Sequence, residues 1–135
     1  MTERSFSMAK LAGASATHVA FAFLAMGGWA LFANRAHGEA AIVPALAQGA
    51  LSGAITFGLK RTLERLAMRL AGWQALALPP LITASAIGAT LVAVHAAIGT
   101  PEIAATIAVP WSVSTLYAIV YAGLLARGRR AGQLG

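Results

Sequence analysis

The stretch KRTLERLAMRLAGW, residues Lys60–Trp73, is the longest charged segment inside the chain and separates two strongly apolar halves. Its leucines recur every three or four residues, and its arginines recur every four. On a helix this spacing places leucines on one face and cations on the other. We therefore expect a basic amphipathic helix over residues 60–72, lying in the headgroup layer of a membrane. The cations expected to contact anionic lipid headgroups are Lys60, Arg61, Arg65 and Arg69.

The composition around this segment is that of a membrane protein. Of the 135 residues, 59% are hydrophobic and 10% are charged, whereas about a quarter of the residues of a soluble domain are charged. Such a chain could not cover its own surface in water, and its length fits a single four-helix membrane domain over residues 1–135. The absence of cysteine excludes disulfides, thiolate metal sites and cysteine catalysis.

Four apolar segments are long enough to cross a bilayer, because about 20 helical residues at ~1.5 Å each span the hydrocarbon core. The third is expected to begin at Pro79–Pro80, since proline suits the first turn of a helix. The fourth is expected to follow a turn at residues 99–102, with Thr100 as its N-cap. The predicted fold is all-α, two hairpins joined by the basic helix, with transmembrane helices at residues 11–33, 41–59, 79–98 and 103–126.

The charges predict the orientation. Nine of the ten Lys and Arg residues fall on one side of these four spans, and Arg35 alone falls on the other. The positive-inside rule then places both termini and the basic segment in the cytoplasm, which predicts a bacterial inner-membrane protein. Outside the basic segment, the cytoplasmic cations would be Arg4, Lys10, Arg127, Arg129 and Arg130.

A faint internal duplication accompanies this topology. Gly27 and Gly38 have the same spacing as Gly88 and Gly99, and a loop glutamate follows each second glycine. The two halves, residues 11–59 and 79–126, would form a parallel repeat. Chance similarity between Gly/Ala-rich spans is the competing explanation.

The second span carries the clearest pattern of polar residues. A polar column would run along it at helical spacing, beside a stripe of small residues that lets a neighbouring backbone approach. One interpretation is helix packing within the bundle or between protomers, and the other is a polar wall facing a cavity. The column residues on this span are Gln48, Ser52 and Thr56, and the predicted helix-packing residues are Ala45, Gly49 and Gly53.

The fourth span contributes the other side of the column. Pro110 cannot donate to the Thr106 carbonyl, so it is expected to kink the helix. Gln48 and Pro110 are each seven residues from the start of their spans and so lie at a similar depth. The Gln48 amide is therefore expected near the opening between Thr106 and Pro110. Alternatively, Ser114 or Thr115 satisfies the kink locally.

A second polar layer is expected deeper in the membrane. His18, Thr56, Ser85 and Tyr117 fall at comparable depths on the four spans. His18 is an ionisable residue inside a span, which indicates a functional site by default. A neutral histidine hydrogen-bonded to Tyr117 or to a carbonyl is the structural alternative.

Polar residues also gather in the two loops of the opposite side. Two histidines and two glutamates could bind a metal ion if they converged. Their spacing matches no metal motif, and carboxylates at helix N-termini have a structural reason in the helix dipole. We therefore predict no metal, cofactor or catalytic site, and only a weak outer-face cluster of His37, Glu39, His95 and Glu102.

These patterns favour a small non-enzymatic membrane protein. The first hypothesis is an accessory or scaffold subunit that packs through small-residue helix faces in a homo-oligomer or a larger membrane complex. The alternative is a minimal oligomeric transporter, lipid flippase or channel that uses the polar column between the second and fourth spans. A lipid-acting enzyme using the outer-face cluster is the third. Nucleic acid is not an expected partner, because the few cations flank apolar spans.

Overall fold

The computed structural model describes the backbone of residues 2–134 and the side chains of Met8, Lys10 and residues 12–132. Arg4, which contributes to the predicted orientation, lies outside the described side chains. The described chain is all-helical, and four of its helices are long and apolar enough to cross a membrane, as expected of an integral membrane protein. In chain order, the elements are α1 (Thr2–Ala33), the 3₁₀ helix η1 (Arg35–Ala41), α2 (Ile42–Arg69), α3 (Trp73–Ala97) and α4 (Ile103–Leu134).

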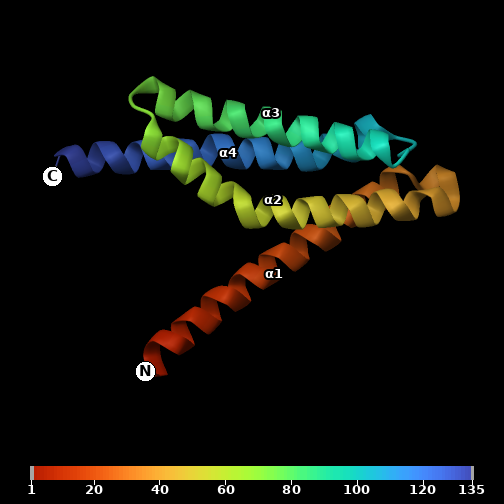
Figure 1. Cartoon of the computed structure of the whole chain (residues 1–135), viewed down its shortest axis with the longest axis horizontal. Helices are drawn as coiled ribbons and strands as arrows, with labels where there is room; N and C mark the ends of the chain where they lie inside the picture. Colours follow the sequence, from red (N-terminus) through yellow and green to blue (C-terminus); the bar gives the residue numbers. More distant parts are fainter. Residues whose placement is uncertain (1, 135) are drawn as a thin grey trace.

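The connections between the helices gather at two opposite ends (Figure 1). At the loop end, η1 lies against the α3–α4 turn, and His37 of the former contacts Glu102 of the latter. At the basic end, the α2–α3 link of residues 70–72 lies beside the C-terminal part of α4, and Arg129 donates to the Leu70 carbonyl. The polar contacts between loops therefore lie at one end, and the arginine-rich segments lie at the other.

α1 packs against α2 near the loop end and then diverges from the other helices toward its N-terminus (Figure 1). The small residues of α2 make the close approach. A Cβ added at Gly49 would lie 2.9 Å from the Phe23 carbonyl oxygen, and one added at Gly27 would lie equally close to the Ala45 carbonyl oxygen. A Cβ added at Gly53 would lie 3.2 Å from a Val19 side-chain methyl group. These backbone contacts end where α1 diverges.

α3 begins earlier than the sequence predicts. The helix starts at Trp73, directly after Gly72 with its positive φ of 58°, and both Pro79 and Pro80 lie inside it. The prediction that prolines open the span is wrong because the proline pair removes only two hydrogen bonds, those to residues 75 and 76. The Thr83 hydroxyl donates to the Pro79 carbonyl at 2.9 Å, which adds a local bond next to the interruption.

The basic segment is the C-terminal part of α2 and not a separate helix. No proline or paired glycine interrupts the chain between Leu59 and Arg69, and the helix stops only where Leu70 becomes extended. Figure 1 shows α2 bending before this part. The Thr62 hydroxyl donates to the Gly58 carbonyl at 3.0 Å, a back-bond of the kind that bends helices.

The apolar face of this segment packs inside the protein. Leu63 is fully buried, and together with Leu59 and Ala118 of α4 it forms a core cluster at the basic end. The expectation that this apolar face lies in the headgroup layer, toward the lipid, is therefore wrong for Leu63. The cations behave differently, because Lys60, Arg61, Arg65 and Arg69 are all exposed.

α3 and α4 are joined by a glycine cap and a tryptophan. Gly99 adopts a φ of 70°, and the Thr100 N–H donates to the His95 carbonyl at 2.9 Å, which closes α3 as a Schellman motif. Further along, the Trp111 indole lies over Gly88 and donates to the Ala84 carbonyl at 2.9 Å. A side chain at position 88 would collide with that indole.

Candidate functional site

One buried polar network is a hydrogen-bonded chain that joins α2 to the C-terminal end of α3, which we call the His95 chain. The His95 Nε2 atom lies 2.9 Å from Gln48 Oε1, and its Nδ1 atom lies 2.7 Å from the Thr100 hydroxyl. The Gln48 amide nitrogen donates to the Ser52 hydroxyl at 2.8 Å. His95 and Gln48 have no exposed surface, and Ser52 and Thr100 are 5% exposed.

The direction of these bonds follows from which atoms can donate. Gln48 Oε1 only accepts, so His95 Nε2 carries a proton. In the neutral imidazole Nδ1 then accepts, and the Thr100 hydroxyl donates to it. Both ring nitrogens and both ends of the Gln48 amide are satisfied. The arrangement satisfies a neutral imidazole completely, and the network contains no charged side chain beside His95.

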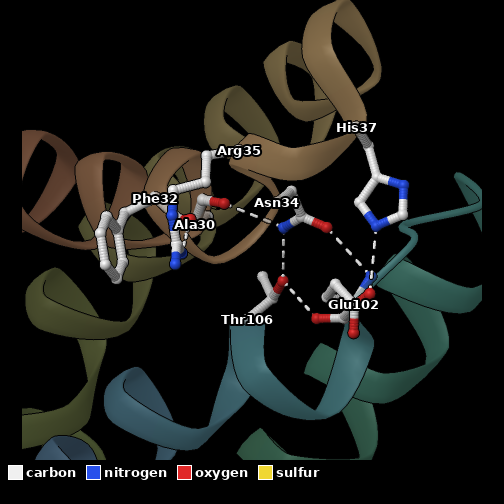
Figure 2. A network of polar contacts seen from close by, with 7 residues as sticks. All are labelled: Ala30, Phe32, Asn34, Arg35, His37, Glu102 and Thr106. Carbon is white, nitrogen blue, oxygen red and sulfur yellow. Dashed lines mark hydrogen bonds and ion pairs between the residues drawn. The ribbon is translucent and has the colours of Figure 1, made fainter.

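A second network, the loop clasp, joins the end of α1 to the start of α4 (Figure 2). The buried Asn34 amide donates to the Ala30 carbonyl at 2.9 Å and to the Thr106 hydroxyl at 2.7 Å. Its carbonyl oxygen accepts the Glu102 backbone N–H at 3.0 Å. Asn34 thus satisfies a backbone donor at the N-terminus of α4 that has no intrahelical partner.

The outer part of the loop clasp is an ion-pair contact. His37 Nε2 lies 3.0 Å from Glu102 Oε1, and both side chains are well exposed to solvent (Figure 2). Such exposed pairs contribute up to about 1 kcal/mol. The Thr106 hydroxyl donates to the Glu102 carbonyl at 2.6 Å and ties this contact to the buried part of the clasp. Glu102, and not Thr100, is the residue directly before the first turn of α4, because its carbonyl accepts from the Thr106 N–H.

The predicted outer-face cluster divides between these two networks. His37 and Glu102 meet in the loop clasp, whereas His95 turns inward to Gln48. Glu39 is exposed and makes no described hydrogen bond. Within the described residues, no three His, Cys, Asp or Glu side chains come close enough to hold a metal ion.

The polar column is only partly assembled. Gln48 is buried as expected of a column residue, but its amide bonds to His95 and Ser52 and not to the opening at Thr106 and Pro110. Thr106 bonds to Asn34 instead. The reason is that Gln48 of α2 faces α3, so His95 of α3 supplies the hydrogen-bond partner that was expected from α4. Thr56 is exposed.

Pro110 lies inside α4, and no described hydrogen bond joins Ser114 or Thr115 to the Thr106 carbonyl. The Ser114 hydroxyl donates to the Trp111 carbonyl at 3.1 Å. The Thr115 hydroxyl is the one buried side-chain polar atom of the described residues with no partner. Nearby, the Trp29 indole of α1 donates to the Ala105 carbonyl at 2.9 Å, which joins α1 to α4.

The deeper polar layer does not form within the chain. Its four members are all exposed: His18, Thr56, Ser85 and Tyr117. α1 diverges from the other helices toward its N-terminus (Figure 1), and no described hydrogen bond joins His18 to Tyr117. The Tyr117 ring stacks on Tyr121 instead, with ring centroids 5.6 Å apart.

Sequence reasoning missed two pairings. The Tyr121 hydroxyl donates to Glu64 Oε1 at 2.6 Å at the basic end, and Gln48 pairs with His95. The sequence signal for the first was a lone glutamate within the basic segment. For the second it was two uncharged polar groups on separate apolar spans, each needing a partner.

No known protein family, curated protein or solved structure matches this chain. The functional argument therefore stands on the geometry alone. The described networks join side chains of different helices and loops, His37 to Glu102, Gln48 to His95 and Glu64 to Tyr121. They can hold helices together, and at the loop end they can hold two connections together.

Proposed function

We propose that the protein is a small non-enzymatic inner-membrane subunit that packs against further transmembrane helices, in a homo-oligomer or a larger membrane complex. The observation that carries the proposal is the exposure of α1. Its segment Ala12–Ala33 is apolar enough to span, yet α1 diverges from the other helices of the chain toward its N-terminus (Figure 1). Its side chains are accordingly exposed, among them Phe21 at 72% and Leu24 at 71%.

Lipid alone can cover apolar side chains, so exposure of phenylalanine and leucine does not require a protein partner. His18 does. It lies roughly 9 Å inside the span at the helical rise, it is exposed, and the described chain offers it no hydrogen bond. Polar groups inside a bilayer face a protein interior or water, because an unpartnered one in hydrocarbon is costly. A second helix at this face would supply what His18 lacks.

The residues around His18 suit such a helix. Gly13, Ala14 and Ser15 are small and exposed, so a neighbouring backbone can approach closely. The Thr17 hydroxyl is already satisfied by the Gly13 carbonyl at 2.9 Å. The same principle operates within the chain, where Gly27 and Gly49 let α1 and α2 touch.

Cysteine cross-linking in native membranes tests this proposal, since the chain has no cysteine of its own. The variant Ser15→Cys should give one discrete oxidised adduct. An adduct of two copies supports a homo-oligomer, and a heavier one supports a larger complex. The matched control is Ala89→Cys, on an exposed face of α3, which should give none.

Adding His18→Leu to the Ser15→Cys variant should weaken the adduct by several-fold, because the hydrogen bond to the partner is lost. The proposal is wrong if Ser15→Cys gives no adduct, or if both cysteine positions give the same mixture of products.

A minimal oligomeric transporter, flippase or channel is the second candidate. The His95 chain favours it, because it is a run of polar groups buried between α2 and α3. For a transporter, Gln48→Leu would abolish solute flux or lipid scrambling in proteoliposomes that the unmodified protein supports. For a packing subunit, vesicles with and without the protein would behave alike.

A further inference from the structure

The basic end contains a groove between α2 and α4 with a volume of about 470 Å³. Its walls come from the last turns of α2 and the C-terminal part of α4. One carboxylate and one guanidinium share it with small and apolar side chains. The lining residues are Glu64, Ala67, Met68, Leu125, Gly128 and Arg129.

The two charges in the groove do not neutralise each other. Among the described residues the ion pair present joins His37 to Glu102, at the opposite end of the molecule. Glu64 and Arg129 therefore line one groove as separate charges. Opposite charges held apart in this way match a ligand that carries both signs.

Each charge is also held in place by a neighbour. Glu64 Oε1 accepts the Tyr121 hydroxyl at 2.6 Å, which fixes the carboxylate and leaves its second oxygen without a described bond. Arg129 donates one N–H to the Leu70 carbonyl at 3.3 Å. A guanidinium has five N–H donors in a fixed fork that suits a phosphate.

The groove lies where the apolar part of α4 gives way to its arginines, so in a bilayer it would face the headgroup layer. We propose that it binds one phosphatidylethanolamine molecule. The headgroup ammonium pairs with Glu64 and the phosphate pairs with Arg129. The part of an acyl chain next to the headgroup lies along Met68 and Leu125. Met68 is 72% exposed, so the lipid can bury its side chain.

The carboxylate decides between lipid classes. A purely anionic headgroup would bring its charge toward Glu64, and like charges repel. Anionic lipids are still expected at the exposed arginines Arg65 and Arg69. They would not occupy this groove, because neither residue lines it. Choline carries a positive charge but no N–H, so it cannot hydrogen-bond to the open carboxylate oxygen as ethanolamine does.

The test is native mass spectrometry of the purified full-length protein, exchanged in detergent against phosphatidylethanolamine, phosphatidylglycerol or phosphatidylcholine. We expect one retained phosphatidylethanolamine in preference to the other two. Glu64→Gln should lower that preference about fivefold, since it removes one ion pair and can still accept from Tyr121. Arg129→Ala should lower retention of every phospholipid at this site. Arg130→Ala, an exposed arginine next in sequence, should change nothing.

Two results would overturn the proposal. One is stronger retention of phosphatidylglycerol than of phosphatidylethanolamine by the unmodified protein. The other is an unchanged lipid preference in Glu64→Gln. Met68→Trp, which fills the groove without touching either charge, gives an independent check on location: retention of phosphatidylethanolamine at the original level would show that the lipid binds elsewhere.

Discussion

At the scale of single residues, this chain is governed by how each buried polar group finds a partner. Gln48 and His95 have no exposed surface, and each satisfies the other across 2.9 Å. A buried donor or acceptor left without a partner costs about 1–3 kcal/mol, which exceeds the net gain from the bond itself. Removing either Gln48 or His95 alone should therefore lower stability by more than the hydrogen bond itself contributes.

We expect His95→Leu to lower the free energy of unfolding by about 1–3 kcal/mol, because Gln48 Oε1 and the Thr100 hydroxyl would lose their partner. The measurement is unfolding in mixed micelles with increasing dodecyl sulfate. The control is Thr90→Val on the same helix, an exposed hydroxyl that bonds only to Ala86 of its own turn.

The double variant Gln48→Leu/His95→Leu sharpens this prediction. Replacing both partners removes the orphaned groups, so the double variant should be less destabilised than the sum of the two single variants. Additive losses would show that the two side chains do not interact in the folded protein.

At the scale of helices, glycine decides which surfaces can meet. α1 and α2 approach through Gly27 and Gly49, where an added Cβ would lie 2.9 Å from a backbone oxygen of the other helix. Backbone cannot move aside as a flexible side chain can, so the helices would have to separate. Gly58, on the same helix α2, has nothing within 4 Å of the corresponding position.

We expect Gly49→Ala to destabilise the protein by about 1–3 kcal/mol through overpacking against Phe23. Gly58→Ala should instead be neutral or stabilising by up to about 1 kcal/mol, because alanine favours the helix. The same micelle unfolding assay compares them. Equal effects of the two substitutions would contradict close packing of α1 on α2.

At the scale of the whole molecule, the two ends differ in charge. Arg35 lies at the loop end, and the arginines of α2 and the C-terminal part of α4 lie at the basic end (Figure 1). If the positive-inside rule applies, the basic end is cytoplasmic. The loop clasp and the ion pair of His37 with Glu102 then face the outside of the cell membrane.

Single-cysteine labelling measures this orientation. A membrane-impermeant thiol reagent should label Glu39→Cys in intact cells, and should label Gly132→Cys only after the cells are broken. Both positions are exposed, so accessibility within the protein does not distinguish them. Labelling of Gly132→Cys alone in intact cells would reverse the assigned topology.

Several features were readable from the sequence because they depend on local composition. Apolar runs of about 20 residues predict spanning helices wherever they lie in a chain, and the four helices follow those runs. The turn at Gly99 could be predicted for the same reason, because a position with a positive φ favours glycine. The orientation remains a prediction from charge alone.

The remaining features depend on contacts between distant segments, which local composition does not determine. Gln48 and His95 are 47 positions apart, and they meet only because α3 presents His95 to α2. The start of α3 before Pro79 and the burial of Leu63 against α4 also depend on neighbours. The sequence by itself determined the membrane class, the number of helices long and apolar enough to span, and the distribution of charge. The tertiary structure alone decided which polar groups pair, because pairing depends on how each helix is rotated and where two helices cross.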